Sequence, residues 1–336
     1  MSRLLRPRHL LALAALVAGA ALADPVARGD AGVAGPLADP AMQADLSVLT
    51  YNVKGLPWPV ATGRDRSLKA IAARLAALRR EGRQPQVVVL QEAFTDQARE
   101  IAARAGYAWH AQGPYARTAP GVSAQAGGQW HLGEPAPALL DSGLAILSDY
   151  PVTSVVRAPF SQGACAGFNC LAAKGVLLVT LAVPGRGEVA VAATHLNSRK
   201  ASGADYERTH AAYARQVAFL EAFLAKHRRA EVPLVLAGDF NRGQRPARIA
   251  ALGAAQERLG LSDAVEALGS PLGTPGERHF ITSRARDMQF TAAGEARALE
   301  PSGGWVPFGR EPDGAMLSDH MGFAVAYRIA ARQPAT

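Results

Sequence analysis

The stretch Val232 to Gly243, VPLVLAGDFNRG, constrains the fold of this chain more than any other. Its apolar run, Leu234 to Ala237, is typical of a buried β-strand. In an extended chain residues i and i+2 point to one side, so Asp239 and Asn241 share a face while Phe240 points into the core. A carboxylate and a carboxamide in that place suit a metal ion, or the orientation of water and a phosphate. Taken alone, the stretch favours a strand followed by an Asx-turn.

The same arrangement recurs along the chain, where apolar runs typical of buried strands end in polar residues. The expected strands span 46–52, 86–92, 142–148, 174–181, 188–197, 286–290 and 323–329. The polar residues at or beside the strand ends are Asn52, Glu92, His195, Asn197, Asp239, Asn241, Asp287, Asp319 and His320. Each alone is typical of a cap or a turn. Together they predict one polar rim, because the ends of adjacent buried strands meet at one edge of a sheet.

Helical spacing of apolar residues separates these strands. It predicts helices over 67–80, 95–105, 206–227 and 246–258. Residues 111–138 are rich in Gly, Pro, Ala, Ser and Gln, and a loop of this length is usually functional or disordered. No boundary divides residues 45–332, so we predict a single α+β domain with packed sheets.

The first 23 residues are typical of a secretory signal peptide. Three arginines precede the apolar run Leu10 to Ala23, which ends in an A-x-A cleavage pattern. This run is too short for a comfortable membrane span, and a short N-terminal anchor is the less favoured alternative. We expect cleavage near Ala23, a flexible leader over 24–44, and a secreted or periplasmic mature protein.

Charge and cysteine content agree with that compartment. The formal net charge of +8 falls to +5 when the three arginines of the signal peptide are removed. A basic protein suits anionic partners such as phosphate esters, nucleic acid or acidic lipid surfaces. The only two cysteines, Cys165 and Cys170, predict a small disulfide-closed loop in an exported protein. A zinc site is disfavoured, because no second Cys or His pair stands near them.

The polar strand ends resemble the motifs of the endonuclease/exonuclease/phosphatase superfamily, in the right order and over nearly the whole mature chain. The matching segments are Tyr51-Asn52, Gln91-Glu92, Ser142 to Ser148, Thr194-His195-Leu196, Gly238 to Asn241 and Ser318-Asp319-His320. The resemblance implies a four-layer α/β sandwich, with two packed mixed sheets flanked by helices. It also implies magnesium-dependent cleavage of a phosphate ester by water.

The resemblance implies a magnesium site in which Glu92 is the main ligand and Asn52 lies beside it. Magnesium prefers carboxylate and water oxygens and keeps positions open for a phosphate, which fits these residue types. Asp239 and Asn241 would orient the attacking water and the phosphate. Phosphoryl transfer needs charge neutralisation and in-line positioning more than covalent chemistry.

The resemblance also implies the acid–base residues. His320 would be the general base and Asp287 would fix its tautomer, a pairing that suits a histidine titrating near neutrality. His195 would bind a phosphoryl oxygen and stabilise its charge, and Asp319 of the Ser-Asp-His motif belongs to the same set. The segment after Asp287 departs from the family, which usually has an aromatic residue soon after this aspartate.

One segment resembles the neutral sphingomyelinase branch of the superfamily. The run SGLAILSDYPV leads through the cysteine-bearing loop to Lys174-Gly175-Val176. This implies that Lys174 places a cation near the phosphodiester or the catalytic centre. We also expect Asn197 to bind the substrate. The alternative for Lys174 is a strand-edge lysine that discourages aggregation.

We therefore expect an exported phosphodiesterase of the phospholipase C type, which hydrolyses sphingomyelin or a related phospholipid to phosphocholine and ceramide. A secreted or periplasmic deoxyribonuclease is the alternative, favoured by the basic charge. A binding module on a decayed nuclease fold is disfavoured, because every motif residue is present.

Trp305 and Phe308 lie in the turn-rich stretch 301–309, which predicts an exposed loop. In the secreted sphingomyelinases that the chain resembles, an aromatic hairpin at this place touches the membrane. The resemblance therefore implies a membrane contact, and the alternative is that both rings fold back onto the sandwich. We expect a phospholipid membrane as the partner, with nucleic acid as the alternative, no protein partner, and a monomer.

Overall fold

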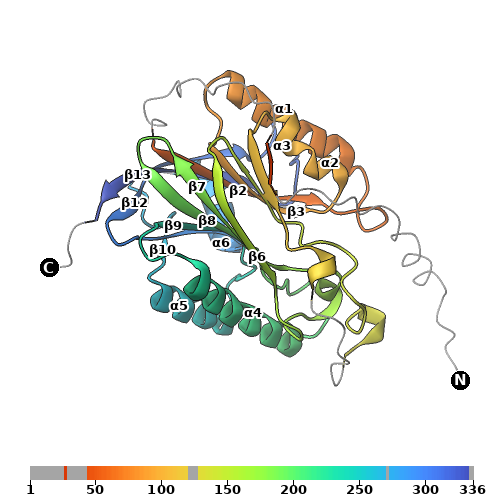
Figure 1. Ribbon diagram of the computed structural model, residues 1–336. Helices are drawn as coiled ribbons and strands as arrows, with labels where there is room; N and C mark the ends of the chain where they lie inside the picture. The colour runs from red at the N-terminus through yellow and green to blue at the C-terminus, as the bar shows by residue number, and fades with distance from the viewer. Residues whose placement is uncertain (1–25, 29–43, 120–127, 270–271, 333–336) are drawn as a thin grey trace, which may run out of the picture.

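Two β-sheets pack face to face and helices cover both outer faces, so the chain folds as a four-layer α/β sandwich (Figure 1). The computed structural model describes residues 26–28, 44–119, 128–269 and 272–332. The predicted signal peptide and most of the predicted leader lie outside these residues. None of the helices in the described ranges is both long and apolar enough to span a bilayer.

The two sheets are mixed, as predicted. The first has the order β1-β4-β5-β3-β2-β13-β12, with β1 Val26–Arg28, β2 Leu46–Gly55, β3 Val87–Ala93, β4 Trp109–Gln112, β5 Ala145–Ser148, β12 Arg297–Phe308 and β13 Gly322–Ala331. The second has the order β10-β11-β9-β8-β7-β6, with β6 Val152–Pro159, β7 Gly175–Val183, β8 Gly187–His195, β9 Leu234–Asp239, β10 Ser262–Asp263 and β11 Asp287–Ala292. Because β13 pairs with β2, the two ends of the predicted domain lie side by side.

Amphipathic helices cover the outer faces of the sheets (Figure 1). The helices are α1 Arg64–Arg80, α2 Asp96–Arg99, α3 Ile101–Arg104, α4 Tyr206–His227, α5 Pro246–Leu259 and α6 Pro275–Arg284, with 3-10 turns η3 Ala116–Thr118, η4 Trp130–Leu132 and η5 Gly167–Leu171. The buried faces of α1 and α3 pack on the first sheet, and those of α4 and α5 pack on the second. The side chain of Asp205 caps α4 by accepting a hydrogen bond from the backbone N–H of Arg208.

The central layer between the sheets is largely apolar, and a buried hydrogen-bond bridge at Gln289 on β11 crosses it. Its Nε2 donates to the carbonyl oxygens of Val48 at 3.0 Å and Phe323 at 3.4 Å, both in the first sheet. Its Oε1 accepts from the Tyr327 hydroxyl at 2.9 Å. Gln289 is fully buried, so these bonds connect the sheets where water cannot replace them.

We expect Gln289→Leu to lower the free energy of unfolding by about 1–3 kcal/mol, the cost of leaving buried polar groups unpaired. Chemical denaturation measures this change, and Gln244→Leu on the surface is the matched control, expected to have little effect. Tyr327→Phe should lower the free energy of unfolding less in the Gln289 variant than in the wild type, because the hydrogen bond between the two residues is already lost. If the two substitutions lowered the free energy of unfolding additively, the hydrogen bond between Gln289 and Tyr327 would not contribute to stability as proposed.

One edge of the sandwich collects the polar strand ends; we call it the site edge. The strand pairs β2–β3 and β8–β9 are parallel, so their carboxyl ends emerge together in each sheet. Packing of β2 against β9 and of β3 against β8 brings the two sets of ends face to face. The amino end of β11 joins them, because Asp287 pairs with Asp239 in antiparallel register.

Several elements differ from the sequence expectations. The stretch 95–105 forms two short helices, α2 and α3, rather than one, and β4, β6 and α6 arise where no element was predicted. Within the expected leader, β1 pairs with β4. The long segment 111–138 contains the end of β4 and two 3-10 turns, while its residues 120–127 lie outside the described part.

The prediction that Trp305 and Phe308 form an exposed loop is wrong, because both lie in β12. Phe308 is 1% exposed and stacks on Tyr51 with ring centroids 4.7 Å apart, while Trp305 packs against the same core cluster. The glycines and prolines that suggested a loop are tolerated because β12 is an edge strand with irregular register. The two rings therefore pack against the fold instead of forming an exposed loop.

Candidate active site

Asp239 is the centre of the polar cluster at the site edge. Its Oδ2 lies 3.5 Å from His195 Nε2 and 3.9 Å from His320 Nε2, and accepts a hydrogen bond from Asn52 Nδ2 at 3.2 Å. Its Oδ1 accepts from the backbone N–H of Asn241 at 3.0 Å. Burial alone would raise the pKa of Asp239, but the surrounding histidines and Lys174 outweigh it and lower that pKa. Asp239 is therefore an ionised, fully oriented carboxylate.

The local sequence places Asp239 in this position. Phe240 points away from the cluster and packs edge-on against Phe290, with ring centroids 5.1 Å apart, as the alternation of side chains predicts. A side chain at Gly238 would place its Cβ 2.0 Å from the carbonyl oxygen of Thr194 on β8. The glycine thus permits β8 and β9 to stay close enough for His195 to reach Asp239.

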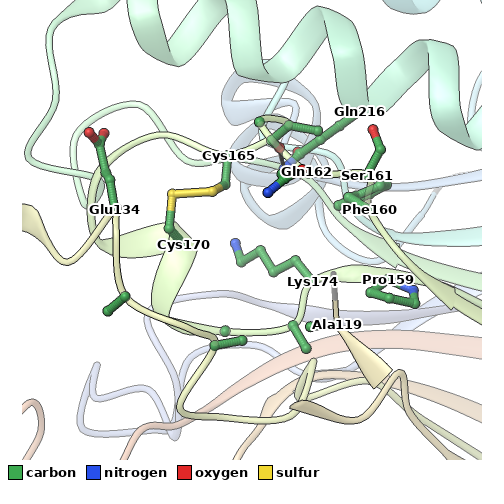
Figure 2. Close-up of a pocket in the computed structure, with 16 residues that line it drawn as sticks. Ala119, Glu134, Pro159, Phe160, Ser161, Gln162, Cys165, Cys170, Lys174 and Gln216 are labelled. Atoms are coloured by element: carbon green, nitrogen blue, oxygen red, sulfur yellow. Dashed lines mark hydrogen bonds between the residues drawn. A yellow bond between two sulfur atoms is a disulfide. The ribbon is translucent and has the colours of Figure 1, made fainter. Parts of the chain in front are cut away.

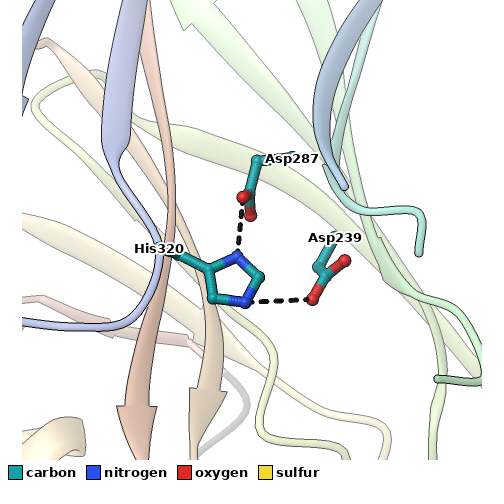
Figure 3. A group of neighbouring side chains, drawn as sticks. All are labelled: Asp239, Asp287 and His320. Atoms are coloured by element: carbon teal, nitrogen blue, oxygen red, sulfur yellow. Dashed lines mark hydrogen bonds and ion pairs between the residues drawn. The ribbon is translucent and has the colours of Figure 1, made fainter. Parts of the chain in front are cut away.

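His320 and Asp287 form a hydrogen-bonded pair beside Asp239 (Figure 3). His320 Nδ1 lies 2.6 Å from Asp287 Oδ2, so Nε2 is the ring atom that faces the cluster. Burial disfavours the imidazolium, but the charge and hydrogen bond of Asp287 and the charge of Asp239 outweigh burial and raise the pKa of His320 to about 9. The Ser318 hydroxyl fixes this segment by donating to the carbonyl oxygen of Asn52 at 2.7 Å.

The pKa of His195 is shifted in the opposite direction to that of His320. Burial is the main cause that lowers its pKa to about 3, so the imidazole ring is neutral at physiological pH. Its Nδ1 is buried without a hydrogen-bond partner among the described residues. A neutral, buried ring with an unsatisfied nitrogen is suited to contact a ligand in the site.

Glu92 and Asn52 form a second acidic group next to Asp239. Asn52 Nδ2 donates to Glu92 Oε1 at 3.0 Å as well as to Asp239, so one amide bridges two carboxylates. Burial raises the pKa of Glu92, which means that its charge is costly without a cation. Its backbone has φ 57°, a strained conformation for glutamate of the kind found at functional sites.

These residues fit a magnesium ion. The donor set consists of hard oxygens, and two carboxylates lie close enough to share one amide group. A divalent cation would offset the free-energy cost of burying their negative charge more completely than the amide dipole does. The Asn52 amide oxygen, which accepts from the backbone N–H of Lys54 at 3.0 Å, is a further hard-oxygen donor on this side of the cluster.

Ligand atoms of Asp239, Asp287 and His320 also lie within 4.8 Å of one another and could hold a metal. However, the 2.6 Å bond between His320 Nδ1 and Asp287 Oδ2 already engages one ring nitrogen and one carboxylate oxygen of this group. A ring nitrogen that faces the cluster, on a ring supported from behind by a carboxylate, is the arrangement of a general base once the ring has lost its proton. The geometry thus suits a cation on the Glu92 side and proton transfer at His320.

Lys174 is buried immediately before β7 rather than lying at an exposed strand edge. Its Nζ donates to Asn169 Oδ1 at 2.8 Å and to the carbonyl oxygen of Leu196 at 3.4 Å. Burial lowers the pKa of Lys174 to about 8, opposed by the charges of Glu92 and Asp239. Its ammonium group therefore acts on the same carboxylates that form the site.

The predicted disulfide between Cys165 and Cys170 is present, with the two Cα atoms 5.2 Å apart. Both cysteines line a pocket together with Lys174 (Figure 2). The closed loop contains Asn169, which binds Lys174 through Oδ1 and donates to Ser198 Oγ through Nδ2 at 3.0 Å. The disulfide thus restrains the residue that orients Lys174.

We expect the double variant Cys165→Ser, Cys170→Ser to fold but to turn over substrate more slowly. Closing so short a loop contributes about 2 kcal/mol in the chain-entropy model, too little to decide whether this domain folds. Loosening Asn169 would displace Lys174, and a misplacement of about 1 Å can cost up to about 10²-fold in rate. Thermal unfolding and steady-state kinetics measure the two effects. Two free thiols in protein from an oxidising compartment would contradict the disulfide itself.

Three predicted residues make structural contacts of their own. Asn197, predicted to bind substrate, uses its amide to accept from the N–H of Ala166 and to donate to the carbonyl of Ser198, so it holds loops in place. The Asp319 carboxylate is half exposed and pairs with Lys54 Nζ at 3.6 Å, outside the central cluster. Asn241 is at the cluster, but its Nδ2 donates to the carbonyl oxygen of Leu196.

Two arginines that sequence reasoning missed hold the loops of the site edge together. Arg248 is 1% exposed, and its Nη1 donates to the carbonyl oxygens of Asn197 at 2.9 Å and Asn241 at 2.7 Å. Arg64 donates to the carbonyl oxygens of Val53 and Leu317, both at 2.8 Å. Nothing in the sequence distinguishes these arginines from surface arginines, since both lie on amphipathic helices.

Comparison with known proteins agrees with this geometry. Residues 49–320 match the Endonuclease/Exonuclease/phosphatase family. Among proteins with curated descriptions, none matches the sequence. Similar solved structures include sphingomyelinase C from Streptomyces griseocarneus, which is 24% identical with a TM-score of 0.57, over 84% of this chain and 98% of that one.

A second similar structure is a Staphylococcus aureus beta toxin mutant with bound magnesium ions, 17% identical with a TM-score of 0.60, over 84% of this chain and 99% of that one. A third is D. rerio TDP2 complexed with a single-strand DNA product, 17% identical with a TM-score of 0.56, over 84% of this chain and 98% of that one. These structures share the fold. With the family match and the cluster around Asp239, they lead to one conclusion: the chain belongs to the endonuclease/exonuclease/phosphatase family of hydrolases.

Proposed function

We propose that the protein is an exported magnesium-dependent phosphodiesterase that hydrolyses a phospholipid such as sphingomyelin to phosphocholine and ceramide. The observation that carries this proposal is the position of Lys174. The Lys-Gly-Val segment resembles the sphingomyelinase branch, and its lysine is buried with its charge acting on Glu92 and Asp239. The likeness to sphingomyelinase C supports the same substrate class.

Glu92 and Asn52 would hold the cation, with Asp239 at its side. When bound, magnesium would polarise the phosphoryl oxygens and offset the charge that develops on them. Asp239, held ionised by the groups around it, would orient the attacking water. His195 would donate a ring N–H to a phosphoryl oxygen, a role that its neutral state permits.

His320 would take the proton from the attacking water at Nε2, which faces the cluster at 3.9 Å from Asp239 Oδ2. Asp287 keeps the ring in the correct tautomer and stabilises the imidazolium that forms. The new bond joins the water oxygen to phosphorus, and the bond between phosphorus and the ceramide oxygen breaks. Phosphocholine retains the water oxygen, and a proton from solvent restores the ceramide hydroxyl.

Export is part of the proposal. The predicted signal peptide lies outside the described residues, so its support is the sequence pattern alone. The disulfide adds support, because such bonds persist in oxidising compartments. Detection of the processed chain outside the cytoplasm, with a new N-terminus near Ala23, would test this part.

A nuclease remains the second candidate because the site edge is basic. Arg199, Lys200, Arg242 and Arg245 lie in the loops after β8 and β9. In the described part of the chain, no carboxylate forms an ion pair with any of the four. Unpaired cations beside a phosphodiesterase site also suit the backbone of a nucleic acid.

A substrate panel separates the two candidates. The purified chain with its disulfide intact would be incubated in magnesium, and in EDTA, with sphingomyelin, phosphatidylcholine, duplex DNA and inositol phosphates. We expect sphingomyelin to release phosphocholine in the presence of magnesium and not in EDTA. Cleavage of DNA without release of phosphocholine would replace the proposal with the nuclease.

A further inference from the structure

The large exposed hydrophobic side chains of the described residues gather at the site edge. They are Trp58 at 74%, Val60 at 67%, Trp130 at 74%, Phe168 at 49%, Tyr206 at 39% and Ile249 at 39% exposure. Trp58 and Val60 follow β2, Trp130 precedes β5, and Phe168 precedes β7. Tyr206 and Ile249 follow the loops that leave β8 and β9.

Sheet topology places these segments around the catalytic cluster. In the first sheet β3, which carries Glu92, lies between β2 and β5. Because Leu90 pairs with Ala145, the segment before β5 emerges beside the carboxyl end of β3. The loop with Trp58 therefore lies beside the strand of Glu92, while the ion pair between Glu134 and Arg208 ties the turn with Trp130 to the start of α4, which follows β8.

The second sheet extends the same surface. Val176 pairs with Thr194, so the segment that contains Phe168 emerges beside the carboxyl end of β8. Phe168 and Leu132 both lie against Gly203, where an added Cβ would meet their side chains at 3.1 and 3.2 Å. This contact places Phe168 next to the turn of Trp130.

The opposite edge of the sandwich has a different composition. Its loops, 81–86, 184–186, 228–233 and 293–296, expose charged side chains such as Glu81, Arg83, Arg186, Arg229 and Glu295. Scattered exposed hydrophobic residues are normal on a protein surface. Their confinement to the edge that carries the active site indicates an interaction surface.

From this arrangement we infer that the site edge docks on a lipid bilayer, with Trp58 and Trp130 inserted on either side of the catalytic cluster. The inference rests on the proposed function, which supplies the lipid substrate. Tryptophan suits the boundary between lipid and water, because it combines an apolar ring with a polar N–H. Arg199, Lys200, Arg242 and Arg245 on the same edge complement the phosphates of the lipid head groups.

This surface takes over the role that sequence reasoning gave to Trp305 and Phe308. Those rings are held in β12 against the core, whereas Trp58 and Trp130 have no such packing. Two separate contacts would also set the orientation of the protein, so that the site between them faces the head groups.

The test measures binding to vesicles of phosphatidylcholine and sphingomyelin in EDTA, so that hydrolysis does not interfere. Trp58→Ser and Trp130→Ser should each weaken co-sedimentation at least about tenfold, the effect of withdrawing one large apolar side chain from lipid. The double variant should bind more weakly than either. Arg83→Ser with Arg229→Ser, on the opposite edge, is the matched control and should bind like the wild type.

Turnover of bis(p-nitrophenyl) phosphate, a soluble phosphodiester, should stay the same in all variants, because the catalytic cluster is untouched. Wild-type binding no stronger than that of the double variant would overturn the inference, as would an equal loss in the control. Duplex DNA binding that needs both tryptophans, without vesicle binding, would overturn it in favour of a nucleic-acid surface. Vesicle binding that needs both tryptophans in an enzyme that does not cleave sphingomyelin would support the docking surface and refute the proposed function.

Discussion

Glu92→Gln should lower magnesium-dependent turnover by more than about 10²-fold, because loss of residues that merely support a metal ligand already costs about 10–100-fold. Glutamine retains the shape of the side chain and an oxygen that accepts from Asn52, so only the charge is removed. Kinetics at increasing magnesium concentrations measure the effect. Wild-type activity with unchanged metal dependence would show that the cation binds elsewhere.

Stability gives an independent readout of the Glu92 variant. Burial raises the pKa of Glu92, so at neutral pH its ionised form destabilises the cation-free fold. The variant should therefore melt at the same or a higher temperature than the wild type in EDTA. Magnesium at about 100 times its dissociation constant should stabilise the wild type by about 2.7 kcal/mol and the variant by much less. Glu100→Gln, an exposed glutamate paired with Arg104, is the control and should behave like the wild type.

His320→Ala should lower turnover by about 10²–10⁴-fold, the usual contribution of a positioned acid or base. The ring is held by the 2.6 Å bond to Asp287, and its Nε2 faces the cluster 3.9 Å from Asp239 Oδ2. Asp287→Asn should cause a smaller loss, because the ring remains but its tautomer is no longer fixed. His279→Ala, on the exposed face of α6, should have no effect.

The pH dependence checks the role of His320. A general base must be neutral, so turnover should rise with pH as His320 loses its proton. The pKa of His320 is raised to about 9 without a cation, and a bound cation near Asp239 would lower it, so the acidic limb should lie below about pH 9. This limb should disappear in His320→Ala. An unchanged acidic limb would show that another group is the base.

Local patterns sufficed to predict the centre of the site. The run before Asp239 is a buried strand, Phe240 is in the core, and the polar ends of β2, β3 and β8 do meet at one edge. These residues obey short-range rules: apolar runs form buried strands, and alternation decides which side chain faces the site. The family resemblance then supplied chemical roles that no spacing rule contains.

Other features depend on contacts between distant residues. β12 contains Pro301 and two glycines, which suggest a loop until its place at the sheet edge is known. Arg248 is buried because Tyr213 and three carbonyl groups surround it, and these partners come from separate elements. Asn197 likewise acquires its role from Ala166 in another loop. Local propensity cannot report partners that only the fold brings together.

The most direct test of the account is hydrolysis of sphingomyelin in water enriched in oxygen-18, followed by mass spectrometry of both products. We expect one labelled oxygen in phosphocholine and none in ceramide, because water attacks phosphorus and the bond to ceramide breaks. The reaction should require magnesium and should be lost in Glu92→Gln. Label in a ceramide phosphate, release of unlabelled phosphocholine, or no reaction in magnesium would contradict it.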